Sequence, residues 1–164
     1  MAKAVSPLYY DGDVRLSVHR YKFHSATGYA KTYAELIAEV MREENLSAEL
    51  LTWVPLSRKR FRSRGYNQAQ LICEELSELM DIPAMPLLVK IKDNPAQSGT
   101  GDAKKRKENV KGVYKALENT DIAGKSVIIV DDVITTGSTI SECAKMLRAA
   151  GCKQVFAASL ARSK

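Results

Sequence analysis

Two adjacent aspartates followed by a hydroxyl-rich loop form the stretch of this sequence that is best suited to chemistry. The segment VIIVDDVITTGSTI runs from Val127 to Ile140, with Asp131 and Asp132 directly after four apolar residues. The loop that follows offers hydroxyl donors and one glycine, and it consists of Thr135, Thr136, Gly137, Ser138 and Thr139. Glycine lets the backbone approach a ligand closely, so this loop suits a phosphate group. The two carboxylates would repel phosphate and instead require hydrogen-bond donors or a cation.

A ligand that combines phosphate and hydroxyl groups would satisfy both halves of this segment. In a ribose with a 5′-phosphate, the phosphate would meet the loop and the vicinal hydroxyls would donate to Asp131 and Asp132. A hydrogen bond to a charged group contributes about 1.5–3 kcal/mol, so two of them make a selective clamp. Two alternatives stay open at this point. Either the pair holds Mg²⁺ directly, or a strand that happens to end in two acids precedes a capped helix.

The elements around this segment place it at an edge of a sheet. Val127–Val130 is apolar and largely β-branched, which predicts a buried strand, and the residues from Thr139 to Gly151 have the apolar spacing of a helix. Thr139 and Glu142 have the spacing of a capping box. The loop therefore precedes a helix N-terminus, whose N–H groups carry about half a positive charge. Open α/β sheets bind ligands at this edge, at the carboxyl ends of their strands.

Alternating strand and helix patterns predict the fold of the chain. Apolar stripes predict helices over Tyr29–Glu44 and Ala69–Met80, and apolar runs predict strands at Leu50–Leu56, PLLVKI and QVFAASLA. No linker or repeat divides the 164 residues. We therefore expect one α/β domain over residues 1–164, with a mainly parallel central sheet and helices on both faces.

The composition excludes several classes of protein. The 45% hydrophobic content is ordinary for a globular chain, and the apolar stretches fall short of the roughly 18 residues of a membrane-spanning helix. The N-terminal segment MAKAVSPLYYDGDVR lacks the apolar core of a signal peptide. We therefore predict a cytoplasmic protein without a membrane span. The three cysteines, with no CxxC, support neither a disulfide framework nor a zinc ribbon.

Positive charge is concentrated in two short segments of a chain whose net charge is +6. Arg58–Arg64 and Lys104–Lys111 each contain five basic residues. Either segment suits an anion such as nucleic acid, pyrophosphate or a phosphorylated sugar, and either is compatible with a solvated basic surface. Phe61 and Tyr66 interleave the first segment, which favours single-stranded DNA as one ligand.

The segment VIIVDDVITTGST resembles the phosphoribosyl-pyrophosphate (PRPP) motif of type I phosphoribosyltransferases, in which an apolar strand, two acids, two apolar residues and TTG[GS]T follow one another. The resemblance implies a type I phosphoribosyltransferase-like fold. It also implies that Asp131 and Asp132, the expected catalytic residues, contact the ribose hydroxyls, while the loop from Thr135 to Thr139 binds the 5′-phosphate. Mg²⁺ is the implied cofactor, carried by the pyrophosphate of the ligand and not by a metal site of the protein.

Two further segments are similar to proteins of the ComF family. VPLSRKRFRSRGYNQAQLICEEL carries the family's P-L, spaced arginines and R-G-[FY]-N-Q, and NPAQSGTGDAKKRKENVKGVYKA carries its Q…R…N…G-[AV]-[FY] pattern. With the PRPP motif, these segments cover most of residues 50–164, and the resemblance is weaker over residues 1–49. Many members begin with a small cysteine-rich zinc module, and we expect a variant without it.

Similarity to the ComF family implies a PRPP-binding, phosphoribosyltransferase-like protein linked to DNA uptake in natural competence. Its activity, where present, would be that of a glycosyltransferase. The alternative is a non-catalytic module that binds single-stranded DNA or a helicase partner on the same fold. Because the first basic segment is a candidate for both pyrophosphate and DNA, the two ligands should compete if both hypotheses hold.

The resemblance to the wider fold also assigns places to the remaining ligand groups. The turn after the first core strand should bind pyrophosphate through Leu56, Ser57, Arg58 and Lys59. The polar loop over residues 92–107 corresponds to a flexible lid that excludes water, in which the leaving pyrophosphate would be neutralised by Lys104, Lys105 and Arg106. Aromatic residues near the N-terminus line an acceptor hood or fill the core, and both remain open for Tyr9, Tyr10, Tyr21 and Phe23.

Overall fold

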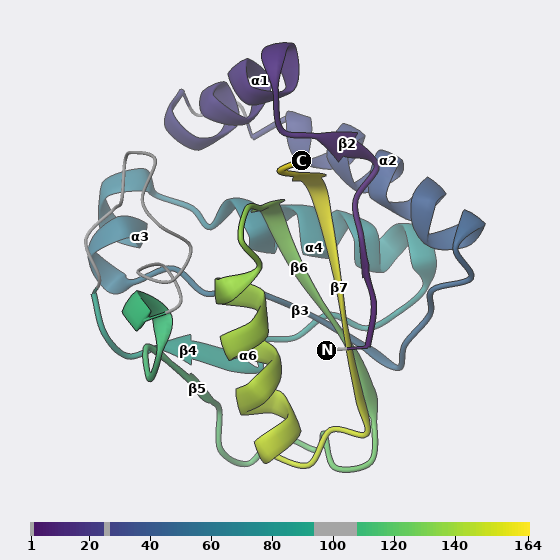
Figure 1. The fold of residues 1–164 in the computed structure, drawn as a ribbon, viewed down its shortest axis with the longest axis vertical. Coiled ribbons are helices and arrows are strands. Elements are labelled where there is room, and N and C mark those ends of the chain that lie inside the picture. Colours follow the sequence, from purple (N-terminus) through teal and green to yellow (C-terminus); the bar gives the residue numbers. More distant parts are fainter. Residues whose placement is uncertain (1, 25–26, 94–107) are drawn as a thin grey trace.

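A central sheet of parallel strands organises the chain (Figure 1). The structure is a computed structural model that describes residues 2–24, 27–93 and 108–164. Within these residues, three parallel strands lie side by side in the order β7 (Gln154–Arg162), β6 (Ser126–Ile134) and β3 (Leu50–Trp53). Two short strands, β1 (Ala4–Val5) and β2 (Leu8–Tyr9), both pair with β7 in parallel. The prediction of a mainly parallel sheet is confirmed.

The central position of β6 follows from its sequence. Its apolar residues Val127–Val130 are all buried, as expected for a parallel strand that is covered on both faces. Beyond these four residues the strand continues to Ile134. Asp131 and Asp132 therefore belong to β6 itself, and Asp131 is in register with Ser159 of β7.

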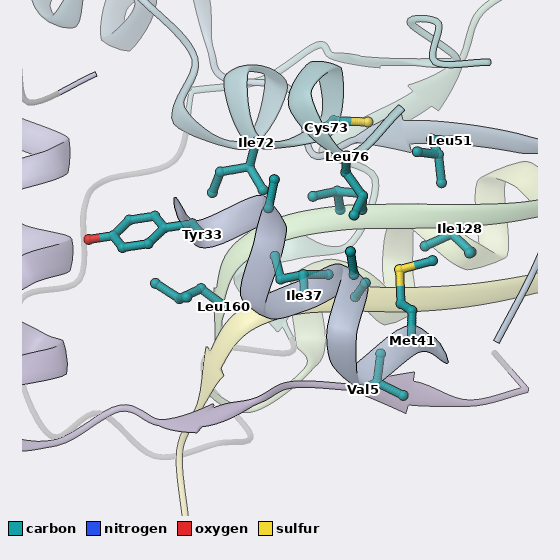
Figure 2. Packing of buried hydrophobic residues seen from close by; sticks show 14 of the residues in the cluster. Val5, Tyr33, Ile37, Met41, Leu51, Ile72, Cys73, Leu76, Ile128 and Leu160 are labelled. Carbon is teal, nitrogen blue, oxygen red and sulfur yellow. The ribbon is translucent and has the colours of Figure 1, made fainter. Parts of the chain in front are cut away.

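Two long helices cover one face of the sheet. They are α2 (Tyr29–Glu43) and α4 (Gln68–Met80), and their bounds match the two predicted helices to within one residue. Their apolar stripes meet each other and the sheet in one buried cluster (Figure 2). This cluster includes Ile37, Met41, Ile72, Leu76 and Ile128.

The other face is covered by α6 (Ser138–Ala149) and by a small antiparallel pair, β4 (Leu88–Lys90) with β5 (Tyr114–Ala116). Ile140 and Leu147 of α6 share a second buried cluster with Val127 of β6. Helices thus cover both faces, as predicted. The segment PLLVKI does form a strand, but that strand pairs with β5 in a second sheet and not with the central one.

Two further helices are α1 (Gly12–Phe23) and α3 (Arg58–Arg64), and the sequence analysis treats the latter only as a basic segment. Its helical form has local causes. The side chain of Ser57 accepts a hydrogen bond from the Arg60 N–H at 3.3 Å, which caps the start of the helix. Gly65 ends it with a φ of 81°, a left-handed conformation that favours glycine. Among the described residues, no helix has the length and apolar character that a membrane crossing requires.

Asn67 joins the end of β3 to the start of α4, and we expect its loss to destabilise the fold. Its Oδ1 accepts from the N–H groups of Ala69 at 3.0 Å and Gln70 at 3.3 Å, and its Nδ2 donates to the Val54 carbonyl at 3.0 Å. Because Asn67 is buried, Asn67→Ala should lower the free energy of unfolding by about 1–3 kcal/mol. Urea denaturation measures this change. Gln70→Ala removes only an exposed bond to Glu74, should cost at most about 0.5 kcal/mol, and serves as the control.

Candidate functional site

A cavity of about 400 Å³ lies at the carboxyl ends of β3 and β6. Its walls come from the loop after β3, the end of β6, the start of α6, the β4–β5 pair and the N-terminal segment. Seven of the predicted site residues line it: Leu56, Asp131, Asp132, Thr135, Thr136, Ser138 and Thr139. The structure therefore brings the two halves of the central motif together at the sheet edge where α/β folds bind ligands.

The hydroxyl-rich loop forms the N-terminal turn of α6. Gly137 is the N-cap residue and has a φ of 71°, which glycine adopts without strain. It lines a smaller hollow that adjoins the cavity and shares Asp131 with it. The Ser138 and Thr136 hydroxyl oxygens lie 2.9 Å apart, so these side chains are oriented by each other.

The predicted capping box at Thr139 and Glu142 is wrong. The helix begins one residue earlier, its N-cap residue Gly137 has no side chain to cap it, and the Ser138 N–H makes only a long contact of 3.5 Å to Thr136 Oγ1. The Glu142 carboxylate instead accepts a hydrogen bond from the Gly112 N–H at 2.9 Å, before β5. Apart from this long contact, no side-chain cap at the N-cap position competes for the N–H groups at the start of α6, which favours an anion there.

The acid pair is oriented by the backbone of β6. Asp131 Oδ1 accepts from the Asp132 N–H at 2.9 Å, and Asp132 Oδ1 accepts from the Val133 N–H at 2.7 Å. The two carboxylates differ in exposure: Asp131 is partly exposed, whereas Asp132 is only 3% exposed. Each side chain is thus held by the amide that follows it.

Lys22 of α1 is a site residue that the sequence analysis missed. Its Nζ lies 2.7 Å from Asp132 Oδ2 and forms an ion pair with it. Burial alone would lower the pKa of Lys22, but the Asp132 carboxylate more than offsets this and the pKa is raised. The lysine is therefore charged at neutral pH and neutralises Asp132. No sequence pattern connects this residue with a motif more than a hundred positions away.

Of the two carboxylates, Asp131 is the one whose pKa is raised. Burial and then the negative charge of Asp132 raise its pKa well above the usual range, while Lys22 acts in the opposite direction. A like charge nearby disfavours the charged form of a carboxylate. A ligand that donates hydrogen bonds or brings a cation would relieve this repulsion.

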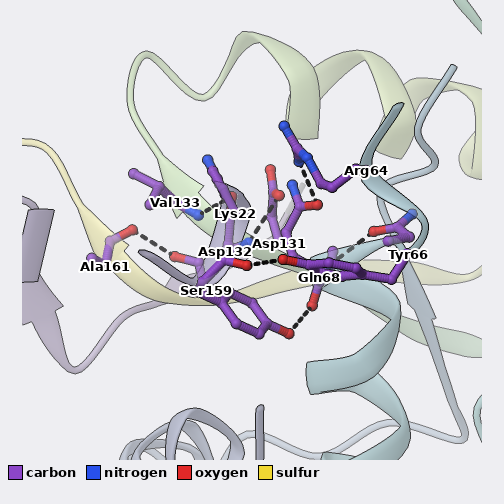
Figure 3. Close-up of polar contacts among 12 residues, drawn as sticks. Lys22, Arg64, Tyr66, Gln68, Asp131, Asp132, Val133, Ser159 and Ala161 are labelled. Atoms are coloured by element: carbon purple, nitrogen blue, oxygen red, sulfur yellow. Dashed lines mark hydrogen bonds and ion pairs between the residues drawn. The ribbon is translucent and has the colours of Figure 1, made fainter. Parts of the chain in front are cut away.

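The segment RGYNQ holds α1 over the acid pair (Figure 3). Arg64 Nη1 donates to Gln68 Oε1 at 2.6 Å, and the Gln68 carbonyl accepts from the Tyr21 hydroxyl at 2.7 Å. The Tyr66 hydroxyl donates to the Tyr21 carbonyl. Burial raises the pKa of Tyr21, so its phenol is a neutral donor. Because Tyr21 precedes Lys22, these bonds fix the backbone from which Lys22 reaches Asp132.

Two cationic residues also line the cavity. They are Arg60 of α3 and Lys90 of β4, and neither is among the predicted site residues. Burial lowers the pKa of Lys90, and the charge of Arg60 lowers it further. The Lys90 Nζ also lies 5.6 Å from the centre of the Tyr114 ring. An anion in this part of the cavity would relieve the repulsion between the two cations.

Of the residues predicted to bind pyrophosphate, the structure brings only Leu56 to the cavity wall. Ser57 is buried as the cap of α3, and Arg58 and Lys59 are exposed and do not line the cavity. The helical form of α3 explains the difference, because it turns Arg60 inward while its two predecessors face outward. The predicted lid residues Lys104, Lys105 and Arg106 lie outside the described residues.

The aromatic residues near the N-terminus divide between the two roles left open by the sequence. Tyr10 lines the cavity. Tyr21 belongs to the core, where its ring meets that of Tyr33 edge-on at 5.2 Å. Tyr9 and Phe23 are exposed. Only Tyr10 is therefore placed to contact a ligand in the cavity.

Known proteins resemble this chain in sequence. Residues 63–164 match the model of the phosphoribosyl transferase domain family. The chain is 34% identical to competence protein F of Haemophilus influenzae, over 94% of this chain and 70% of that protein. It is 30% identical to the DNA utilization protein YhgH of Escherichia coli, over 89% of this chain and 66% of that protein. The chain thus spans about two thirds of the length of these relatives.

Solved structures resemble it in fold. Glutamine PRPP amidotransferase from B. subtilis, complexed with ADP and GMP, matches 80% of this chain and 26% of its own with a TM-score of 0.54 and 23% identity. Adenine phosphoribosyltransferase from Thermoanaerobacter pseudethanolicus matches 87% of this chain and 83% of its own, with a TM-score of 0.50 and 19% identity. At these identities the likeness shows the fold alone, which is the type I phosphoribosyltransferase fold expected from the sequence.

Removing the charge of Asp131 should stabilise the protein at neutral pH. Because its pKa is raised on folding, ionised Asp131 costs stability, and this cost appears as the pH rises above the ordinary value of 3.8. Asp131→Asn keeps the oxygen that accepts from the Asp132 N–H and should raise the free energy of unfolding by about 0.5–2 kcal/mol at pH 7. In urea denaturation, the gain over the wild type should grow with pH and then level off.

The matched control for this prediction is Asp121→Asn. Asp121 is an exposed carboxylate that pairs with Lys125 at 2.8 Å, so its loss should give no gain in stability. A gain for Asp131→Asn that shrinks as the pH rises would contradict the assigned direction of the pKa.

Proposed function

Because the chain belongs to the phosphoribosyl transferase domain family and, within it, to the ComF family of competence and DNA-utilization proteins, we propose that its cavity binds PRPP. One observation carries the proposal: a single cavity joins a helix N-terminus whose N-cap is a glycine, an acid pair and two cationic side chains. PRPP offers a matching group to each. Inorganic phosphate alone would leave the acid pair without donors.

Each group of the ligand has a place in this arrangement. The 5′-phosphate binds at the start of α6, from Thr135 to Thr139, where N–H groups and hydroxyls converge. The ribose hydroxyls donate to the acid pair. The pyrophosphate binds at Leu56, next to Arg60 and Lys90, which take the role that the sequence assigned to Arg58 and Lys59.

The acid pair also suits Mg²⁺ that arrives with the pyrophosphate. Mg²⁺ prefers oxygen ligands and is usually held by one or two carboxylates together with substrate phosphates and waters. Asp131 fits this role, because it is partly exposed and lines the cavity, whereas Asp132 is paired with Lys22. Among the described residues, no cluster of three or more His, Cys, Asp or Glu could hold a metal ion by itself. When bound, Mg²⁺ supplies charge neutralisation for the pyrophosphate.

The same residues suit the transfer reaction. The bond between ribose C1 and the pyrophosphate oxygen breaks, so positive charge develops on the sugar and negative charge on the leaving group. Asp131 lies on the side of the sugar, and Arg60 and Lys90 on that of the pyrophosphate. Fixed charges that match the developing ones lower the barrier, and they do so without rearrangement of the protein.

A second candidate function is binding of single-stranded DNA on the outward face of α3. Arg58, Phe61 and Arg62 lie at helical positions i, i+3 and i+4 and are all exposed, Phe61 by 47%. Phe23 of α1 is 61% exposed, and the Arg64 guanidinium lies 5.1 Å from its ring centre. Exposed aromatic rings beside cations stack on unpaired bases and neutralise phosphates. A competence helicase is the alternative partner for this face.

Two substitutions should separate the ribose and pyrophosphate subsites. Asp131→Asn removes a charged acceptor and should weaken both PRPP–Mg²⁺ and ribose 5-phosphate by about tenfold or more. Lys90→Ala should weaken PRPP–Mg²⁺ but change ribose 5-phosphate little, because the latter has no pyrophosphate. Isothermal titration at constant ionic strength measures both ligands.

Lys115→Ala is the control for the loss of a lysine from the β4–β5 pair. Lys115 lies on β5 next to Tyr114, but its side chain is exposed and does not line the cavity. Its loss should leave both affinities unchanged. Unaltered PRPP binding in both Asp131→Asn and Lys90→Ala would refute the assignment of the cavity.

The DNA hypothesis predicts salt-dependent binding that is insensitive to PRPP. Arg58, Lys59 and Arg62 do not line the cavity, so we expect the two ligands to bind together and not to compete. Each phosphate contact should add about 0.7 to the slope of log K against log salt. Fluorescence anisotropy of a labelled oligonucleotide at several salt concentrations, with and without PRPP–Mg²⁺, measures both effects.

A double variant with Arg58→Ala and Arg62→Ala loses two phosphate contacts. The slope of log K against log salt should therefore fall by about 1.4. The control carries Lys145→Ala and Lys153→Ala, which remove two exposed cations of α6 and of the turn before β7. Equal loss in both double variants would mean that DNA binds by general charge and not through α3. No binding at low salt would leave the face to a protein partner.

A further inference from the structure

The carboxylate of Asp132 is closed to ligands in the structure described here. Its Oδ1 accepts from the Val133 N–H at 2.7 Å, and its Oδ2 is fully buried beneath the ammonium of Lys22, 2.7 Å away. A ribose hydroxyl must come within hydrogen-bond distance of one of these oxygens to be bound by Asp132. The Lys22 side chain stands in the way of that approach.

We propose that Lys22 is a displaceable plug: it covers Asp132 in the free protein and moves aside when ribose hydroxyls take its place on the carboxylate. This inference rests on the proposed function, since it concerns the same ribose subsite. In the free protein, the ammonium neutralises Asp132 and so permits two adjacent acids at the end of a buried strand. In the bound protein, the hydroxyl donors of the sugar replace it.

Lys22 can leave Asp132 by a movement of its side chain alone. The backbone on the N-terminal side of Lys22 is fixed, as Tyr21 is bonded through its hydroxyl to the Gln68 carbonyl and through its carbonyl to the Tyr66 hydroxyl (Figure 3). The Lys22 side chain itself is 23% exposed and lines the cavity, so rotation about its flexible stem takes the ammonium from Asp132 into that space.

Opening requires a replacement, because separating a buried pair leaves an uncompensated charge. Asp131, which is partly exposed, is available to the sugar at once. Asp132 becomes available only when the donors that displace Lys22 are present. Part of the binding energy of the hydroxyls is therefore used to move the lysine, and the wild type shows less preference for ribose over 2-deoxyribose than its two carboxylates would allow.

The test compares ribose 5-phosphate with 2-deoxyribose 5-phosphate. The two ligands carry the same charge, so the ratio of their dissociation constants isolates the hydroxyl from general effects of losing a cation. Lys22→Ala removes the plug, and we expect the preference for ribose 5-phosphate to rise about tenfold over that of the wild type, the factor for one hydrogen bond to a carboxylate. Isothermal titration at pH 8 measures both constants for each protein.

Two further variants keep the test decisive. Lys22→Gln retains a neutral donor beside Asp132, preserves more of the local packing, and should raise the preference in the same direction but less. Lys115→Ala removes an exposed cation outside the cavity and should leave the preference unchanged. A preference that stays constant or falls in both Lys22 variants would overturn the plug while the proposed function stands. Failure of the wild type to bind ribose 5-phosphate would overturn both.

Discussion

Asp131 and Asp132 lie next to each other where β6 leaves the core, and their charges have to be accommodated there. The four residues before them are buried between two layers of helices, so the strand cannot shift to expose the acids. Backbone amides satisfy one oxygen of each side chain, but Asp132 is only 3% exposed, and burial of a charge is costly unless the charge is paired. The ion pair with Lys22 meets this requirement. The position of α1 over the sheet edge is therefore an electrostatic necessity as much as a matter of packing.

The apolar packing of α1 contributes little to holding it in this position. Of its twelve residues only Val18 and Tyr21 are buried, and large apolar side chains such as Leu16 and Phe23 are exposed. The helix is held instead by Tyr21, whose hydroxyl and carbonyl are both bonded within the RGYNQ segment. Asn67 of the same segment ties α4 to the end of β3. One pentapeptide thus links the strand end, the helix that covers the sheet and the helix that supplies the cation. This gives the segment a physical role without requiring each of its residues to touch a ligand.

The sequence allows most of the fold to be predicted, together with the half of the site that is contiguous in the chain. The apolar strand and the glycine before α6 depend on local conformational preferences, so they can be predicted from the amino-acid sequence. Lys22, Arg60 and Lys90 are not, because they reach the cavity only through tertiary packing. Of the three, Arg60 is the residue that local signals could predict. Ser57 and Gly65 are ordinary signals for the start and end of a helix, and a helix between them turns Arg60 away from Arg58 and Lys59.

Helix α3 divides one basic segment between two separate surfaces. Arg60 and Arg64 lie one helical turn apart on the inward side, where Arg60 lines the cavity and Arg64 positions Gln68. Arg58, Phe61 and Arg62 lie on the outward side and are exposed. Membership in the phosphoribosyl transferase family accounts for the cavity, yet a fold specifies neither the acceptor nor the partner. The residues of the outward face do not line the cavity. The proposed binding of DNA on this face therefore does not require catalysis in the cavity. A helix only seven residues long is enough to keep the two surfaces apart.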